Sequence, residues 1–466
     1  MFVGRDAEIE RLNSSFKLNK SQLMVVYGRR RIGKSEMLKR FCKNKNHWFF
    51  DGLERQRTTA QIDNCMKVLS NALINEKFVS KIKFKTWSEF FDFLTECIRK
   101  QKKKMIIVFD EFQWLACQQS HLPAYLKHYW DNYWKDLNVQ IILCGSIASY
   151  MVKKVIRSKA LYGRINLEIG LKGLKPHESR KMLNKRGELE VLQYLMVLGT
   201  IPKYLDDINQ NKSLDENLNQ LCFVSDGGYV DEIDKVFFSQ FKETRNYKRI
   251  VELLSKGNYS LTEISKKLKI ISGGGLRGYL DNLEKAGFIR SCTSIDNDGP
   301  KDKKFKLFDE FLIFHFKFIE PNLKIIKENE SRNIFKTLVR SRWQPWLGIA
   351  FKTFCLKHAL YLAERAGFAE DVLSYAPYFA RGENNFQIDL IFKRSNNIYV
   401  LCEIKFADDL ITPTIITQIE KKCYELSKRL KSGVTIEKML ITTQGMNSAL
   451  RSSRYFHHCL TLKDIF

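Results

Sequence analysis

Apolar runs alternate with amphipathic segments over the first 175 residues of the chain. Five runs have the length of strands, and helical segments, in which apolar residues recur every three or four positions, separate them. The expected strands cover residues 23–27, 48–50, 105–109, 141–144 and 165–171. This alternation predicts an α/β domain, residues 1–175, with a mostly parallel sheet covered by helices.

The pattern changes at four later points. Residues 176–240 have helical periodicity and are expected to form a small lid on the first domain. Residues 241–320 change to three short helices and a hairpin. The charged stretch 321–345 is expected to be a linker. In residues 346–466 a helix, strands, a second helix and a further strand predict a second α/β domain.

The middle segment has the element order of a winged helix-turn-helix. Its helices and strands are expected at residues 247–256, 261–268, 275–286, 288–290 and 304–307. Ser260 and Glu263 form a capping box that opens the second helix. Leu276, Leu280 and Leu283 mark the buried side of the third helix. The two strands are expected to form a hairpin around a polar loop.

The middle segment is only mildly basic. Residues 241–310 contain fifteen Lys/Arg against ten Asp/Glu. Three glycines at 273–275 permit close approach to a phosphate, but they are also a costly start for a recognition helix. The sequence therefore leaves two roles open for this segment, contact with DNA and packing within the chain.

The chain as a whole is strongly basic, with 78 Lys/Arg, 52 Asp/Glu and a formal net charge of +26. Such a charge favours polyanions such as nucleic acid or an anionic membrane face. Lysine runs such as residues 102–104 fit a solvated surface equally well. We therefore expect DNA as a partner, and this expectation needs support beyond the charge.

Length and composition limit the class of protein. A chain of 466 residues exceeds one ordinary core, and an apolar content of 44% argues against disorder. No apolar run approaches the roughly 20 residues of a membrane helix, and the first residues lack the layout of a signal peptide. The eleven cysteines include no C-x-x-C pair. We therefore expect a cytoplasmic protein with reduced thiols and no membrane contact.

A glycine-rich loop follows the first expected strand and opens a helix. Residues 28–35 read Gly-Arg-Arg-Arg-Ile-Gly-Lys-Ser, which is the phosphate-binding P-loop pattern. Backbone N–H groups of the loop surround the β-phosphate, Lys34 neutralises the β- and γ-phosphate oxygens, and Ser35 is a ligand of Mg²⁺. The expected ATP-binding residues are Gly28, Arg29, Arg30, Arg31, Ile32, Gly33, Lys34, Ser35 and Glu36.

Two carboxylates follow the third expected strand, which is uniformly apolar over residues 105–109. Next to a P-loop, Asp110 is expected to hold Mg²⁺ through water, and Glu111 to polarise the water that attacks the γ-phosphate. Ser146 ends the fourth strand, where a small polar group suits sensing of the phosphate or of that water. Arg164 has two open roles, a finger toward a neighbouring subunit in an oligomer or an ion pair within its own domain.

Two expected strands near the C-terminus carry a second set of acidic residues. They cover residues 387–392 and 398–405, joined by a Ser-Asn-Asn turn. In a hairpin, Asp389 and Glu403 can approach closely enough to share a divalent metal, Mg²⁺ or Mn²⁺. Lys405 is then placed to steady the attacking hydroxide. An exposed hairpin with charges on its solvent face has the same pattern.

The chain resembles the archaeal-type ATPases in the STAND branch of the AAA+ family. The residues that carry this resemblance are Phe2-Val-Gly-Arg5-Asp-Ala-Glu8, the P-loop, Phe109-Asp-Glu-Phe-Gln113, Gly145-Ser146, Leu161-Tyr-Gly-Arg164 and Gly199-Thr-Ile-Pro202-Lys-Tyr204-Leu. The resemblance implies a P-loop NTPase core with a helical lid, in which Pro202 packs on the adenine of ATP, and a winged helix.

The C-terminal pattern of Asp389, Glu403 and Lys405 resembles the PD-(D/E)xK nucleases, and the ATPase family often carries such a domain. This implies a restriction-endonuclease-like α/β fold for residues 346–466. One departure concerns the preceding helix, because Lys352 stands where the family usually has a glutamate. The sequence thus leaves two functions open: an ATP-regulated, metal-dependent deoxyribonuclease, or an ATP-dependent switch whose nuclease-like domain binds a partner or DNA without cutting.

Overall fold

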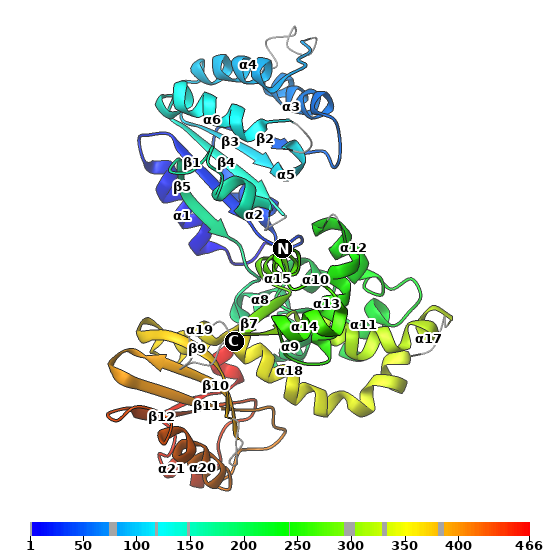
Figure 1. The fold of residues 1–466 in the computed structure, drawn as a ribbon, viewed down its shortest axis with the longest axis vertical. Coiled ribbons are helices and arrows are strands. Elements are labelled where there is room, and N and C mark those ends of the chain that lie inside the picture. Colours follow the sequence, from blue (N-terminus) through cyan, green and yellow to red (C-terminus); the bar gives the residue numbers. More distant parts are fainter. Residues whose placement is uncertain are drawn as a thin grey trace. The chain divides into compact units, whose positions relative to one another are not determined.

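The computed structural model describes residues 2–73, 82–116, 120–146, 150–241, 243–292, 303–328, 333–380 and 386–466. Contacts along the chain divide it into two compact units, residues 2–173 and 174–466. Figure 1 shows the elements of both units, which are described separately below. In the described ranges, no helix is both long and apolar enough to cross a membrane.

The first unit is built on a parallel sheet of five strands in the order β2-β3-β4-β1-β5. The strands are β1 (Gln22–Tyr27), β2 (His47–Asp51), β3 (Met105–Asp110), β4 (Val139–Gly145) and β5 (Ile165–Gly170). Every residue of β3 and β4 is buried, which explains why their sequences are mostly apolar. The predicted α/β class is confirmed.

Helices cover both faces of this sheet (Figure 1). They are α1 (Asp6–Lys17), α2 (Lys34–Cys42), α3 (Thr58–Ala72), α4 (Trp87–Arg99), α5 (Phe112–Leu115) and α6 (Leu122–Asn132). Strand alternation divides the apolar side chains, so that Leu23 and Val25 pack with α3, α4 and α6, whereas Met24 and Val26 pack with α1 and α2.

The second unit begins with five helices, as the helical periodicity of residues 176–240 predicts. They are α8 (Pro176–Met182), α9 (Glu188–Leu198), α10 (Pro202–Asp206), α11 (Leu214–Cys222) and α12 (Glu232–Gln240). Helix α9 is apolar on nearly every side and buries seven of its eleven residues. It packs against α16 (Glu310–Phe314) and α18 (Trp343–Lys357), and therefore lies inside the unit.

The elements of the middle segment follow the order expected for a winged helix-turn-helix. They are α13 (Arg245–Ser255), β6 (Tyr259–Ser260), α14 (Leu261–Leu268), α15 (Gly274–Lys285), β7 (Ile289–Cys292) and β8 (Lys304–Leu307). The three strands pair antiparallel in the order β6-β8-β7. The Ser260–Glu263 capping box forms, and Leu276, Leu280 and Leu283 are buried as predicted. The expected polar loop between β7 and β8 lies outside the described residues.

The segment that we expected to be a charged linker, 321–345, is largely helical where it is described. It contains α17 (Leu323–Glu328) and the short helical turns Phe335–Val339 and Arg340–Arg342. Ile326, Phe335 and Val339 join the core of the second unit. Apolar residues at helical spacing lie between the charged ones, and their burial holds this segment in the core. The many charged residues concealed this apolar pattern in the sequence.

The C-terminal region forms a mixed sheet in the order β13-β12-β11-β10-β9. The strands are β9 (Val372–Ala380), β10 (Phe386–Arg394), β11 (Ile398–Lys405), β12 (Thr435–Thr442) and β13 (His458–Leu460), and the further helices are α19 (Ala359–Arg365), α20 (Ile415–Ser427), α21 (Ser448–Ser452) and α22 (Leu462–Ile465). Strands β9 to β11 are antiparallel, and β11 to β13 are parallel. One apolar core continues from the lid helices through the winged helix to one face of this sheet.

Candidate nucleotide site and C-terminal carboxylate cluster

The P-loop connects β1 to α2 with a backbone that requires glycine at both ends. A Cβ atom on Gly28 would lie 2.5 Å from the backbone oxygen of Leu171. Gly33 has a φ of 87° at the residue before α2, a conformation that glycine adopts without strain. The loop therefore brings its backbone N–H groups to the N-terminus of α2, where an anion is stabilised.

Two buried cationic side chains support the loop. The ammonium of Lys34 donates to the carbonyl oxygen of Arg29 at 3.1 Å, and the side chain is 5% exposed. The guanidinium of Arg5 donates to the carbonyl oxygen of Ile32 at 2.9 Å. A carbonyl rather than a carboxylate thus holds Lys34. In the part of the chain that the structure describes, no carboxylate forms an ion pair with its ammonium.

Acidic side chains collect where the neighbouring strands end. Asp110, the last residue of β3, is buried, and its Oδ1 accepts the backbone N–H of Glu111 at 2.9 Å. Asp51 ends β2 and pairs with Asp110 in the sheet register. Burial raises the pKa of Asp51, and the carboxylates of Asp110 and Glu111 raise it further. Within the described residues, neither Asp110 nor Glu111 forms an ion pair, so this edge suits a divalent cation.

Glu111, Ser146 and Gln113 form one hydrogen-bonded group. The hydroxyl of Ser146 and the side-chain amide of Gln113 both donate to Oε2 of Glu111. Strand β4 lies between β1 and β3, so Ser146 stands between the strand that leads into the P-loop and the strand that carries the two acids. Gly145 leaves room for the group, because a Cβ there would lie 2.7 Å from Oε1 of Gln113.

Sequence reasoning did not assign a role to Gln113 or Asp51. Gln113 lies two residues after Glu111, and Asp51 ends a strand that is next to β3 in the sheet. The position of Asp51 at a strand end was a usable signal, because the carboxyl ends of parallel strands meet at one edge. The other expected loop residues are present, with Arg30 and Glu36 exposed and Arg29 buried.

Arg164 forms the intradomain ion pair that was one of its two expected roles. Its Nε donates to Oδ1 of Asp131 at 2.6 Å, and a second guanidinium nitrogen donates to Oδ2 at 2.8 Å. The hydrogen bond from Arg164 lowers the pKa of Asp131. The sequence gave no reason to single out Asp131, which lies on α6, thirty-three residues before Arg164.

Pro202 belongs to the second unit and is described only within it. It is half-buried and is the first residue of α10. The turn before it is tightly fixed, because Gly199 has a φ of 67° and a Cβ there would lie 2.9 Å from Oε2 of Glu310. Its role toward adenine stays a prediction.

The hairpin predicted near the C-terminus forms from β10 and β11. Leu390 pairs with Cys402, and the same antiparallel register carried one residue further places Asp389 opposite Glu403. Both carboxylates are buried, Asp389 with 7% and Glu403 with 2% of the residue exposed. The hairpin therefore brings together the two acids that the sequence singled out.

Lysines neutralise both of these acids. Lys352 on α18 lies 3.0 Å from Oδ1 of Asp389. Lys405 lies 3.0 Å from Oε1 of Glu403, and Lys422 on α20 lies 2.7 Å from its Oε2. Burial raises the pKa of Glu403, but the two lysines together bring that pKa below its ordinary value. Lys352 thus fills the place of the missing glutamate with the opposite charge.

Lys422 and Lys306 complete the cluster, and neither was predicted. Lys422 lies on α20, and nothing in the motif of Asp389, Glu403 and Lys405 points to it. Lys306 lies on β8 of the winged helix; burial lowers its pKa and the carboxylate of Asp389 opposes this change. In the described ranges, no three His, Cys, Asp or Glu side chains come together as metal ligands.

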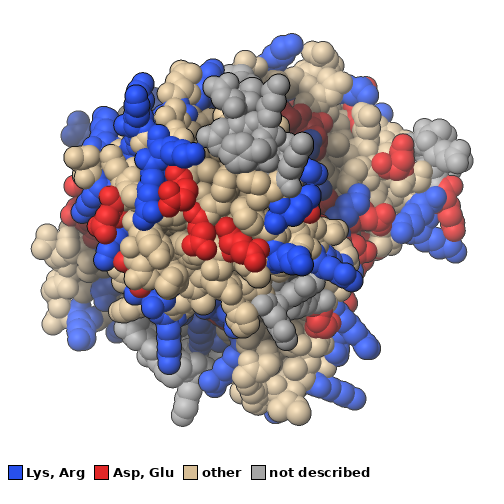
Figure 2. Space-filling model, turned by 90° about the horizontal axis from the view of Figure 1, so that it is seen from above, with Lys and Arg blue, Asp and Glu red and all other residues tan. Residues whose placement is uncertain are grey.

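Positive charge is not gathered at one place on the face of the molecule that Figure 2 draws. Figure 2 shows lysine and arginine side chains across the visible face, with acidic side chains among them. The formal charge of +26 therefore does not by itself point to one binding surface. Local pairing has to identify the sites.

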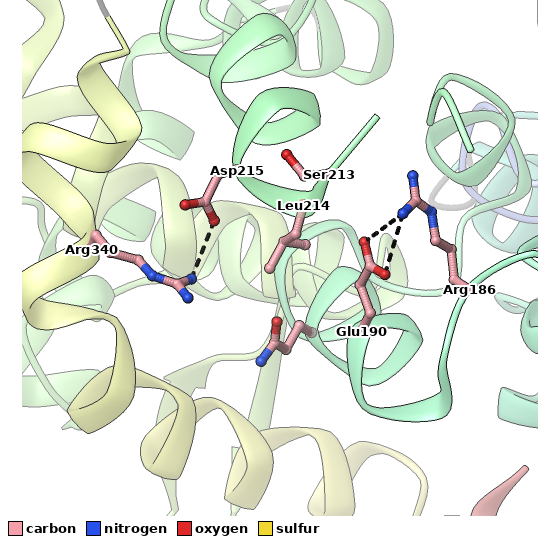
Figure 3. A pocket seen from close by; sticks show the side chains of 7 residues that line it. Arg186, Glu190, Ser213, Leu214, Asp215 and Arg340 are labelled. Carbon is pink, nitrogen blue, oxygen red and sulfur yellow. Dashed lines mark hydrogen bonds and ion pairs between the residues drawn. The ribbon is translucent and has the colours of Figure 1, made fainter. Parts of the chain in front are cut away.

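A hollow of about 410 Å³ in the second unit is a candidate anion site that ion pairs exclude (Figure 3). Two arginines line it, but Arg186 pairs with Glu190 at 3.3 Å and Arg340 pairs with Asp215 at 3.2 Å. Each cation has its own carboxylate, so the hollow offers no excess charge to an anionic ligand.

Comparison with known proteins assigns both regions. Residues 2–208 match the model of an ATPase domain predominantly from Archaea, and residues 315–422 match DUF234, archaeal and bacterial proteins of unknown function. An uncharacterized protein of Methanocaldococcus jannaschii is 28% identical over 435 residues, 92% of either chain. An uncharacterized ATP-binding protein of that organism is 47% identical over 45 residues, 10% of this chain and 76% of that protein.

Among solved structures, a Walker-type ATPase of Pyrococcus abyssi has a TM-score of 0.51 and 20% sequence identity. The match covers 68% of this chain and 96% of the other, and it shows a shared fold. Together with the P-loop on β1 and the acids at the end of β3, these matches agree on the N-terminal region. Residues 2–208 are therefore similar to an ATPase domain that is found predominantly in Archaea, and residues 315–422 are similar to DUF234.

Proposed function

We propose that this ATPase is a switch of the STAND type, in which binding and hydrolysis of ATP control the C-terminal domain. The observation that carries the proposal is the contact between Ser146 and Glu111 at the strand edge beside the P-loop. A serine that holds the carboxylate can sense whether a γ-phosphate is present, because both would compete for the same hydrogen bonds.

In this proposal each residue of the nucleotide site has a role. Backbone N–H groups of residues 28–33 and the ammonium of Lys34 bind the phosphates, and Glu111 orients the attacking water. Ser35 and Asp110 would hold Mg²⁺, which supplies neutralisation of the charge on the transferred phosphoryl group. Asp110 and Glu111 form no ion pair in the described residues, which supports a cation at this edge. Pro202 is proposed to pack on the adenine.

Arg164 keeps two proposed roles. Its bidentate bond to Asp131 favours a structural role within the first unit. The alternative is an arginine finger that leaves Asp131 and reaches the nucleotide of a neighbouring subunit in a homo-oligomer. The second role requires the ion pair to break.

ATP turnover of purified variants tests the proposal. Lys34→Ala should abolish ATP binding, whereas Glu111→Gln should bind ATP and hydrolyse it about 10²–10³-fold more slowly. Ser146→Ala should retain binding and lose the difference in proteolysis pattern between ATP and ADP. Lys43→Ala, an exposed lysine directly after α2, is the matched control. Unchanged turnover in both Lys34→Ala and Glu111→Gln would refute the site.

For the C-terminal domain we propose binding of DNA without cleavage, in preference to a metal-dependent deoxyribonuclease. The specific observation is the ion pair between Lys352 and Asp389, which places a cation where a divalent metal would need a ligand. Glu403 is likewise occupied by two lysines. In this proposal the fold of a nuclease is retained as a binding surface.

A supercoiled-plasmid assay with Mg²⁺ or Mn²⁺ separates these two functions. The proposal expects equal, background nicking for the wild-type protein and for Glu403→Ala. Nicking by the wild-type protein that disappears in Glu403→Ala would establish the deoxyribonuclease instead. Calorimetric titration of the wild-type protein and of Glu403→Ala with Mn²⁺ gives the same answer without DNA, because only an ion held at the nuclease site would be lost in that variant.

A further inference from the structure

The acids and lysines of the C-terminal cluster differ in exposure. The side chains of Asp389 and Glu403 are 5% and 2% exposed, whereas those of Lys352 and Lys405 are 44% and 36% exposed. The carboxylates therefore lie beneath the ammonium groups. A ligand that approaches from solvent meets the lysines first.

These exposed ammonium groups have donors to spare. Each lysine ammonium carries three N–H donors, and the contacts with Asp389 and Glu403 each use one oxygen as acceptor. Lys422, 12% exposed, takes the second oxygen of Glu403 from below. The buried acids thus fix the positions of Lys352 and Lys405 and leave N–H groups directed toward solvent.

The charge of the cluster has the sign that repels a metal ion. Three lysines pair with two carboxylates, which leaves an excess of one positive charge. Lys306 on β8 also interacts electrostatically with Asp389, although burial lowers the pKa of this lysine. The net positive charge of the three paired lysines and two carboxylates favours an anion over a cation.

We propose that this cluster binds a phosphate group of a nucleic-acid backbone directly through Lys352 and Lys405, without a metal ion. This inference deepens the proposed binding of DNA and rests on it, but it is independent of the ATPase proposal. Lys422 and the two buried acids are positioning residues for the two lysines.

The choice of a polymer over a small anion rests on charge. Each of the two ammonium groups can donate to an oxygen of a phosphodiester, and the chain carries a net charge of +26. A nucleic acid presents many phosphates and can contact other lysines of the chain at the same time, which a single phosphate cannot do. Inorganic phosphate and ATP are therefore the small-anion competitors in the test.

The test measures binding of a fluorescent DNA duplex to the full-length protein in EDTA, by polarisation at several salt concentrations. The wild-type protein should bind in EDTA. Lys352→Ala and Lys405→Ala should each weaken binding about 5–10-fold and lower the salt slope by about one, and the double variant should lose more. Lys421→Ala is the matched control, since it removes an exposed lysine from α20 beside Lys422; it should change the affinity less than twofold.

Three results would overturn the proposal. Binding that needs Mg²⁺ or Mn²⁺ would show a metal site, and a double variant with wild-type affinity would place the DNA elsewhere. Competition by millimolar phosphate as effective as that of the duplex would identify a small-anion site.

Lys352→Glu adds a reciprocal readout: it should lose DNA binding and gain Mn²⁺ binding by calorimetry. ATP turnover of each variant confirms that it folds, and absence of turnover in the wild-type protein would refute the switch alone.

Discussion

The nucleotide site and the C-terminal cluster use the same kinds of residues with opposite electrostatic results. Both place buried acids on strands, and both have lysines nearby. At the nucleotide site Asp110 has no ion-pair partner in the described residues, and a carbonyl holds Lys34. At the C-terminal cluster each acid is bonded to at least one lysine.

This difference determines which ligand each site favours. Burial and the neighbouring carboxylates of Asp110 and Glu111 raise the pKa of Asp51, and a divalent cation would relieve the repulsion between these acids. Acids that are outnumbered by paired lysines need no metal cation. The lysines lower the pKa of the carboxylate, as at Glu403. The presence of acids is therefore a weaker indicator of a metal site than the absence of paired lysines.

The largest expected effect follows from removing an uncompensated acid. Asp110→Asn should lower Mg²⁺-dependent ATP turnover about 10²–10³-fold, because the site loses a carboxylate that would hold the ion. ATP binding in EDTA should remain near the wild-type value, measured by fluorescence titration. Asp136→Asn, an acid in a turn of the same unit, is the control. An unchanged dependence on Mg²⁺ would mean that Asp110 is not part of a cation site.

A second prediction contrasts a backbone-built site with one built from side chains. Gly28→Ala should destabilise the first unit by about 2–4 kcal/mol and weaken ATP binding, because its Cβ meets the backbone oxygen of Leu171 at 2.5 Å. Gly348→Ala, on α18 near Lys352, has no atom within 4 Å of the new Cβ and should stabilise by about 0.5–1 kcal/mol. Thermal unfolding measures both. Equal changes in unfolding temperature for the two variants would show that the close contact at Gly28 does not constrain the P-loop.

Sequence patterns predicted the backbone-built site well. A P-loop depends on local order, a strand followed by glycines and a helix, so the positions of residues 28–35 follow from a short stretch of chain. The five strands of the sheet and the capping box at Ser260 have the same local origin. Winged-helix leucines were predictable because burial follows the helical period.

Pairing between distant residues was not predictable. Lys422 and Lys306 reach the carboxylate cluster from α20 and β8, and nothing local to the motif announces them. Asp131 likewise reaches Arg164 from a distant part of the sequence, thirty-three residues earlier. The helical character of residues 321–345 was also missed, because the count of charges concealed the apolar residues between them. Long-range contacts of side chains determine ligand preference, and a single sequence does not list them.

A third, smaller effect concerns the acid that two lysines neutralise. Because the pKa of Glu403 is lowered in the folded state, its ion pairs stabilise the protein fully above the ordinary value of about 4.3. This stabilisation is lost as the pH falls through the lowered value. Glu403→Gln should therefore cost about 1–3 kcal/mol at pH 7, less than a fully buried pair, since Lys405 reaches solvent.

Denaturant titration at pH 7 and at pH 3–4 checks the direction of this pH dependence of the free energy of unfolding. The difference between wild-type protein and Glu403→Gln should shrink at the lower pH. Glu364→Gln is the control, because the pair between Glu364 and Lys175 is more than half exposed on both sides and should matter little at either pH. A difference that grows on acidification would contradict the lysine pairing.

The smallest expected effect separates the two roles of Arg164. The partly exposed pair with Asp131 should contribute about 0.5–1 kcal/mol, so Arg164→Ala and Asp131→Asn should lower the unfolding temperature by similar, small amounts. If the pair is structural, as its bidentate geometry favours, ATP turnover of both variants stays within about twofold of wild type. A finger would act differently: only Arg164→Ala would then lose turnover, by about 10³-fold, and the wild-type rate would rise with protein concentration because the arginine comes from a neighbour. The two variants thus decide whether the charge of Arg164 serves its own domain, like the lysines of the C-terminal cluster, or a site in another subunit.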